Sequence, residues 1–196
     1  MGRPVTMDYP PKYHKHVRLS GNDYRQGAYF VTLCSRARQE LFGRIAGTGP
    51  DALMELNDMG HIVDECWRAI PDHFPHAHLD QTQIMPDHLH AIVVLSPIGS
   101  TQWVDATGAL NDDGTIGDGA DPAAAIGARP NGPKRGSLGA IIGAFKSVTT
   151  KRINAIIGRT GGTVWQHGYY ERAIRRQGGE YGRIAQYIAD NPANWR

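Results

Sequence analysis

The residues best suited to chemistry are two histidines that flank one leucine, His88-Leu89-His90, at the start of the apolar run HLHAIVVL (88–95). In a β-strand, residues i and i+2 project from the same face about 7 Å apart, so two imidazoles there can converge on one ion. The leucine between them then points to the opposite side, where covering helices would bury it. The pattern predicts a pair of metal-binding histidines at the polar end of a buried strand. Two hydrogen-bonded core histidines are the structural alternative.

Two other His-x-His triplets fit a metal site less well. HKH (14–16) has a charged middle residue and lies in a Pro-containing arm, so we expect it to be solvated. HFPHAH (73–78) is richer in histidine, but a proline breaks its spacing and no Cys or carboxylate completes a structural zinc set. We interpret it as a loop between a helix and a strand.

A hydroxyl nucleophile and a third ligand occur together near the chain end, in QYIADN (186–191). Tyr187 and Asn191 are four residues apart, hence neighbours on one face of a helix. The Asn191 amide oxygen can complete a His/His/Asn set, which suits Mg²⁺ or Mn²⁺ with zinc not excluded. A phenol has a pKa of about 10, so attack by Tyr187 needs help in losing its proton. Alternatively, Tyr187 packs in the core and Asn191 ends the helix before Pro192.

The elements that must position these residues can be read from periodicity and turn residues. We expect an N-terminal arm over 1–26 and an uncertain second strand over 41–56, interrupted by a Gly/Pro turn. The segment 163–175 is expected to be a short strand or extended segment that turns into a short helix. The clearer strands are predicted at 27–35, 77–85 and 88–95, and the clearer helices at 57–74 and 137–157. A last helix is predicted within 179–195 and must stop near Asn191, before Pro192. This order predicts an α+β, ferredoxin-like βαββαβ sandwich, with an antiparallel sheet, helices on one face and a C-terminal helix that carries the nucleophile.

The 196 residues suit one domain, which we place at 27–196. The stretch 97–136 is rich in Gly, Ala and Asp and poor in large apolar residues, so we expect a flexible insertion there. A net charge of +2 identifies no partner, but the segments 2–44 and 134–183 are each locally basic. Cys34 and Cys66 form no C-x-x-C pair, and no run has signal-peptide or transmembrane character. We expect a cytoplasmic, nucleoid-associated protein with reduced thiols.

Five blocks of the chain together resemble the single-tyrosine HUH transposases, in particular the REP-associated tyrosine transposase group. They are RLSGNDYRQGAYFVTLCSRARQELFG, IMPDHLHAIVVL, LGAIIGAFKSVTTKRIN, VWQHGYYERAIR and YIADNPANW. The similarity runs from about Val17 to Trp195, apart from the insertion. The resemblance implies that His88, His90 and Asn191 bind the metal and that Tyr187 is the nucleophile.

One residue departs from the pattern of the group. The residue before the first histidine is usually Asn, whereas this chain has Asp87. Because Asp87 has the opposite strand parity from the two histidines, we expect it to have little effect on the metal.

The resemblance further implies a metal-dependent transesterase that cleaves and rejoins single-stranded DNA at hairpins of palindromic repeats. Tyr187 would form a 5′-phosphotyrosine link and release a 3′-hydroxyl. Monomer and homodimer both remain open. A non-catalytic single-stranded nucleic-acid-binding module and a phosphoesterase that uses water are the alternatives. Candidate contacts to DNA phosphates or bases are Lys146, Lys151, Arg152, Arg172, Arg175, Arg176, Trp165, Tyr169 and Tyr170, of which Tyr169 and Tyr170 are also rival nucleophiles.

Overall fold

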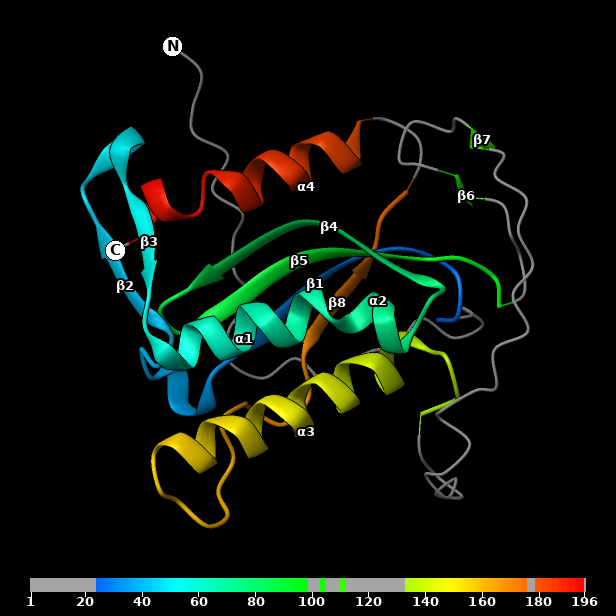
Figure 1. Cartoon of the computed structure of the whole chain (residues 1–196). Coiled ribbons are helices and arrows are strands. Elements are labelled where there is room, and N and C mark those ends of the chain that lie inside the picture. The colour runs from blue at the N-terminus through cyan, green and yellow to red at the C-terminus, as the bar shows by residue number, and fades with distance from the viewer. Residues whose placement is uncertain (1–23, 99–102, 105–109, 112–132, 176–178, 196) are drawn as a thin grey trace.

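A four-stranded antiparallel sheet forms the centre of the protein (Figure 1). The computed structural model describes residues 24–98, 103–104, 110–111, 133–175 and 179–195. Along the sheet the strands follow the order β4-β5-β1-β8. Their bounds are β1 Gly27–Cys34, β4 Ala77–Met85, β5 His88–Leu95 and β8 Tyr170–Ala173.

Helices cover both faces of this sheet, as Figure 1 shows. Helices α1 (Asp58–Arg68) and α3 (Leu138–Ile156) pack side by side on one face, and α4 (Glu180–Ala189) crosses the other. The short α2 (Ile70–His73) leads from α1 into β4. The chain order β1-α1-β4-β5-α3-β8 is βαββαβ with α4 appended. The predicted ferredoxin-like fold class is therefore confirmed.

Strand alternation divides the buried side chains between two clusters. Leu33, Leu89 and Val93 point toward α1 and α3, where they join Trp67 and Phe145 in the main core. The strand residues of opposite parity face α4, where Phe30, Ile92 and Ile174 form a smaller cluster with Ile184 and Ile188 of α4. Because successive side chains on a strand point to opposite faces, the sheet buries apolar residues on both sides.

The segment 41–56 forms a β-hairpin rather than a single interrupted strand. Its strands are β2 (Gly43–Ala46) and β3 (Leu53–Leu56), separated by the short 3₁₀ turn η2 (Gly49–Asp51). The Gly/Pro turn recognised in the sequence reverses the chain between the two strands. The hairpin contacts the C-terminal 3₁₀ turn η4 (Pro192–Asn194), which follows α4.

Two further expectations need correction at the level of elements. The helix expected over 57–74 is divided between α1 and α2, with Pro71 in the first turn of α2, a position at which proline is tolerated. The segment 163–175 contains the expected short strand, β8, but the helix expected after it is absent from the described residues. Pairing with β1 satisfies its backbone groups there and overrides the local preference.

The N-terminal arm and most of the insertion lie outside the described residues. Within 97–136, two short strands pair with each other, β6 (Trp103–Val104) and β7 (Leu110–Asn111). Among the described helices, none combines the length and the apolar character needed to cross a membrane.

Candidate metal and nucleophile site

The two predicted ligands begin strand β5, on the face of the sheet that α4 covers. His88 and His90 are only 4% and 1% exposed, and their ring centroids are 4.4 Å apart. Leu89 between them is fully buried in the main core on the opposite face. The geometry expected from strand parity is thus present, with two imidazoles converging in front of an apolar residue.

Each imidazole uses Nδ1 for a hydrogen bond within the protein. His88 Nδ1 donates to Asp87 Oδ1 at 2.5 Å, and His90 Nδ1 lies 2.8 Å from Thr32 Oγ1. Both Nε2 atoms are buried and have no hydrogen-bond partner among the described residues. A buried polar atom left unpaired lowers the stability of the folded protein by about 1–3 kcal/mol. The two unpaired Nε2 atoms therefore suggest that a ligand binds between them.

The small effect expected of Asp87 rested on strand parity, which does not apply to it. Strand β5 begins at His88, and Asp87 belongs to the turn that precedes it. Its buried carboxylate turns back to His88 through one oxygen and forms an ion pair with Arg38 Nε through the other, at 2.9 Å. Asp87 is therefore in direct contact with a predicted ligand.

The C-terminal segment brings the predicted nucleophile over the histidine pair. The ring of Tyr187, on α4, lies 5.5 Å from the ring of His90, and the ring of Trp195 lies 5.9 Å from that of His88. Phe30 on β1 packs edge-on against Tyr187 at 6.1 Å and stacks on His90 at 5.3 Å. A phenol is thus held beside the imidazoles.

Asn191 follows α4 in a helical conformation, as the N-cap of η4. Its Nδ2 donates weakly to the backbone oxygen of Tyr187, at 3.5 Å, so the two residues are neighbours across one turn as predicted. In the chain Asn191 stands between Tyr187 and Trp195, which contact His90 and His88 respectively. The Asn191 amide therefore lies, in the sequence, four residues from each of the two aromatic residues that contact the histidines.

The donor set fits a divalent cation held by few protein ligands. His88 and His90 offer two unpaired imidazole nitrogens that converge from one strand face. No cluster of three or more His, Cys, Asp or Glu side chains suited to a metal occurs in the part of the chain that the structure describes. Among the described residues, the third ligand that fits this donor set is a neutral oxygen, for which Asn191 Oδ1 is the candidate, and open positions would remain for a substrate.

Electrostatics keep one of the imidazoles in the form that binds metals. Burial holds the pKa of His90 well below its usual value, and the neighbouring His88 and the Arg38 guanidinium lower it further. His90 is therefore neutral at physiological pH, as metal ligation requires.

Two of the predicted DNA contacts lie on the same sheet face as the histidines. In β8, Tyr170 pairs with Thr32 and Arg172 with Phe30, so their side chains share the face of His90. Tyr170 is 47% exposed and packs edge-on against Phe30. Arg172 is paired with Glu180, which also accepts a hydrogen bond from the backbone nitrogen of the exposed Arg175 at 2.9 Å.

The predicted contacts on α3 belong to the other side of the sheet. Lys146 donates to the backbone oxygens of Gln166, at 3.0 Å, and Gly168, and its ammonium lies 5.8 Å from the Tyr169 ring. Burial lowers the pKa of Lys146 to about 8. Arg152 pairs with Glu65 at 2.5 Å, and the nearby Lys151 is exposed.

Two further predicted contacts need separate mention. Trp165 is a core residue, 4% exposed, packed against Phe42 and Phe145 and donating through Nε1 to Thr149 Oγ1 at 2.8 Å. It has no free face for a base, so the predicted stacking role is wrong for this conformation. Arg176 lies outside the described residues.

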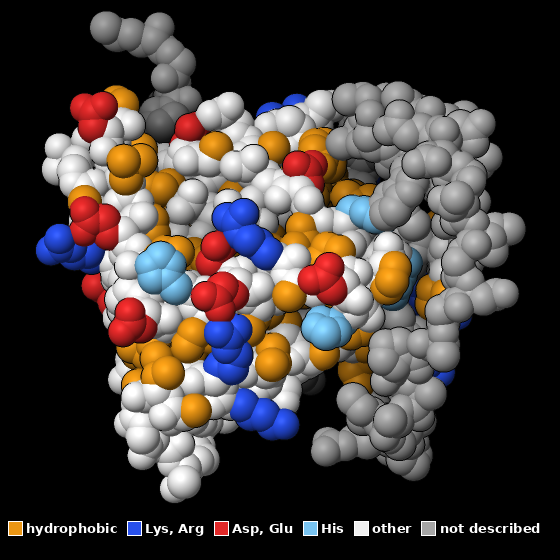
Figure 2. Space-filling view, in the orientation of Figure 1, with side chains coloured by type: hydrophobic (Ala, Val, Ile, Leu, Met, Phe, Trp, Pro, Cys, Tyr) orange, Lys and Arg blue, Asp and Glu red, His pale blue; other side chains and the backbone are white. Residues whose placement is uncertain are grey.

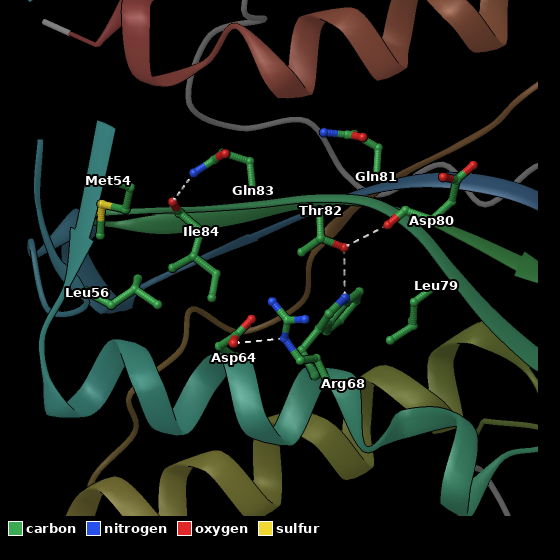
Figure 3. Close-up of a pocket in the computed structure, with 11 residues that line it drawn as sticks. Met54, Leu56, Asp64, Arg68, Leu79, Asp80, Gln81, Thr82, Gln83 and Ile84 are labelled. Carbon is green, nitrogen blue, oxygen red and sulfur yellow. Dashed lines mark hydrogen bonds and ion pairs between the residues drawn. The ribbon is translucent and has the colours of Figure 1, made fainter. Parts of the chain in front are cut away.

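A pocket shown in Figure 3 is separate from the histidine site. It opens between β3, β4 and α1, beside the ion pair of Asp64 and Arg68 at 2.8 Å. Gln81 and Gln83 in Figure 3 point the other way, toward α4. On the molecular face seen in Figure 2, basic and acidic side chains are interspersed, as expected of an ordinary solvated surface.

The sequence reasoning did not identify Thr32, Phe30, Trp195 or Arg38 as residues of the site. Thr32 alternates with Phe30 in a predicted strand, so its face could have been inferred but not its partner. Trp195 follows Asn191 at a helical spacing of four, which was a usable signal. Arg38 reaches Asp87 from a distant loop, and nothing in the local pattern indicates that contact.

The comparisons with known proteins begin with a protein of Haemophilus influenzae, described only as uncharacterized. It is 32% identical to this chain over 191 residues, which cover 93% of this chain and 90% of the relative. The chain belongs to the family of this protein. No family model matches the sequence.

Among solved structures, the fold is similar to that of a REP-associated tyrosine transposase bound to a REP hairpin. The TM-score is 0.50 at 16% sequence identity, and the match covers 93% of this chain and 73% of that chain. At this identity the likeness establishes the fold alone. This chain therefore has an α+β fold similar to that of the solved transposase.

Proposed function

We propose that the protein is a metal-dependent transposase-type transesterase that cleaves and rejoins single-stranded DNA through a 5′-phosphotyrosine intermediate. The observation that carries the proposal is the Tyr187 ring 5.5 Å from His90, beside two buried and unpaired imidazole nitrogens. A nucleophile and a site for a charge-stabilising cation are the two parts that such a reaction needs.

Tyr187 would act as the nucleophile, and Phe30 would position its ring. Tyr187 Oη attacks the scissile phosphorus and forms a P–O bond to the 5′ side of the break. The bond from phosphorus to the 3′-oxygen breaks, the phenol proton leaves to solvent, and the 3′-oxygen takes up a proton to become a hydroxyl. Phe30 fixes the tyrosine ring edge-on and so limits the positions from which it can attack. Because the ester bond is retained, another 3′-hydroxyl can reverse the step without an external energy source.

His88 and His90, through Nε2, and Asn191, through Oδ1, are the residues that would hold Mg²⁺ or Mn²⁺. A cation bound there would stabilise the negative charge that develops on the phosphate oxygens. The Nδ1 contacts of the two histidines keep both rings oriented before the substrate arrives.

The substrate that we propose is a hairpin with a single-stranded flank. The solved structure of similar fold is a transposase bound to a REP hairpin, so a hairpin of this type is the first substrate to test. On this chain, Tyr170 and Arg172 share the histidine face and can contact the flank by stacking and by a phosphate ion pair.

The test is an adduct assay with matched tyrosine variants. Labelled hairpin DNA is incubated with the protein and Mg²⁺ or Mn²⁺, and covalent adducts are resolved on a denaturing gel. We expect the wild-type adduct to be lost in Tyr187→Phe and kept in Tyr170→Phe. The control is closely matched because both tyrosines pack edge-on against Phe30 at 6.1 Å.

Other outcomes separate the competing functions. An adduct that persists in Tyr187→Phe excludes Tyr187 as the nucleophile. Cleavage without an adduct indicates a phosphoesterase that uses water, and binding without cleavage indicates a nucleic-acid-binding module.

A further inference from the structure

A buried carboxylate joins the histidine pair to an arginine from a different part of the chain. Asp87 accepts from His88 Nδ1 through Oδ1 at 2.5 Å and pairs with Arg38 Nε through Oδ2 at 2.9 Å. The Asp87 and His88 side chains are 7% and 5% exposed, while that of Arg38 is 45% exposed. We call Arg38, Asp87 and His88 the positioning triad. This chain of contacts runs from the arginine through the carboxylate to the imidazole, whose Nε2 is unpaired.

Two backbone segments hold the positioning triad in place. Ser35 N donates to Asp87 O at 2.8 Å, and Phe42 N donates to Pro86 O at 3.0 Å, so the turn before β5 is fixed to the loop after β1. Within that loop the 3₁₀ turn η1 (Arg36–Arg38) contains two non-glycine residues with φ of 56°. Such a left-handed conformation is unfavourable for residues with a side chain and persists only where surrounding contacts enforce it.

The chemistry of the carboxylate selects one form of the imidazole. An ionised carboxylate accepts hydrogen bonds and donates none, so the proton of a neutral His88 must lie on Nδ1. The lone pair is then on Nε2, which is the atom left buried without a partner. Arg38 occupies the second oxygen and so restricts rotation of the carboxylate.

We propose that Asp87, held by Arg38, is the positioning residue that fixes the tautomer and orientation of His88 for metal binding. This inference rests on the proposed metal role of the histidine pair. The carboxylate also makes the ring a more basic ligand, and loss of such partners typically weakens metal binding about 10–100-fold. Asp87 in this chain therefore has a role that an Asn cannot fill while Arg38 is present.

The reason is a conflict of donors in Asp87→Asn. The Asn amide has one oxygen, which the Arg38 guanidinium claims, and its NH₂ group then faces His88 Nδ1. That NH₂ donates to Nδ1 and moves the ring proton to Nε2, where it blocks the metal. In the double variant Arg38→Met/Asp87→Asn the amide can turn its oxygen to Nδ1, so the ligating tautomer returns.

The experiment reads the tautomer directly in the metal-free protein. Two-bond ¹H–¹⁵N spectra, recorded with chelator at a pH where the rings are neutral, report which nitrogen carries the proton. We expect Nδ1–H for His88 in the wild type, Nε2–H in Asp87→Asn, and Nδ1–H again in the double variant. His90, which bonds Thr32 instead, is the internal control and keeps its tautomer throughout. Calorimetric titration with Mn²⁺ should show about 10–100-fold weaker binding in Asp87→Asn and recovery to within a few-fold in the double variant.

The results that overturn the inference are equally direct. An Nε2–H tautomer in the wild type contradicts it and needs no variant. An unchanged tautomer in folded Asp87→Asn, or a double variant that binds Mn²⁺ as weakly as the single one, also contradicts it. If the tautomer behaves as expected but the wild type forms no DNA adduct, the proposed function fails while the positioning triad stands.

Discussion

At the residue scale, the site depends on which ring nitrogen of each histidine is hydrogen-bonded to another residue of the protein. His88 is bound to a carboxylate and His90 to a hydroxyl, so the second bond is the weaker and the less selective. A hydroxyl can donate or accept, whereas the carboxylate can only accept. Orientation of His90 therefore also depends on its stacking against Phe30.

The substitution Thr32→Val tests the contact between the Thr32 hydroxyl and His90 Nδ1. It preserves the β-branched shape but leaves His90 Nδ1 without its partner, so we expect about 1 kcal/mol lower stability and roughly tenfold weaker Mn²⁺ binding. Denaturant unfolding and calorimetric titration measure the two effects.

The control is Thr82→Val, which removes the acceptor of the Trp67 Nε1 bond at 3.0 Å, away from the histidines. It should lose similar stability with unchanged Mn²⁺ affinity. Equal losses of affinity in both variants would contradict the role of Thr32.

At the scale of elements, one small apolar cluster attaches α4 to the sheet. Ile184 and Ile188 are buried against Phe30 and Ile92, separately from the main core between the sheet and α1 and α3. Tyr187 is adjacent to Ile188 and packs against this cluster, so the position of the proposed nucleophile depends on it. A helix attached by few buried contacts is expected to open more readily than the core.

We therefore expect Ile188→Ala to release α4. The fully buried side chain leaves a cavity worth about 2–5 kcal/mol, and the loss falls on the small cluster. Amide hydrogen exchange in α4 should rise sharply, and adduct formation should fall with it.

The comparison variant is Ile153→Ala on α3, equally buried but in the main core. It should lower global stability by a similar amount without selectively raising exchange in α4. If amide exchange in α4 does not rise selectively in Ile188→Ala, the small cluster is not what attaches α4 to the sheet.

At the scale of the whole molecule, the sheet separates the predicted basic contacts into two groups. Arg172 shares the face of the histidines, while Arg152 lies on α3 across the sheet. Each is paired with a glutamate, Glu180 and Glu65 respectively. The two arginines are thus matched in local chemistry and differ in position.

We expect Arg172→Ala to weaken hairpin binding and to reduce the slope of log affinity against log salt by about 1, as loss of one phosphate contact does. Arg152→Ala should leave both quantities nearly unchanged. Fluorescence anisotropy across a salt series measures them. An equal change in both variants would mean that the DNA contacts both faces of the sheet.

Much of the fold follows from local sequence patterns, namely the periodicity of apolar residues and the turn residues between the elements. The bounds of β4 and β5 match the predicted strands 77–85 and 88–95, because alternation and the Pro86-Asp87 turn are properties of adjacent residues. The short strand expected within 163–175 is present as β8, but the helix expected at its end was wrong, because β8 is stabilised by pairing with β1, more than a hundred residues earlier in the chain. Pairing across such distances has no local signal.

The sequence by itself determined the βαββαβ order, the shared face of His88 and His90, and the turn between Tyr187 and Asn191. These follow from periods of two and about four residues, which backbone geometry imposes on any chain. Only the tertiary structure decided that Trp165 is buried, that the basic residues divide between two faces, and that Arg38 holds Asp87 against His88. Those contacts depend on strand order and on a strained loop pinned to a distant turn, and no short-range pattern encodes either.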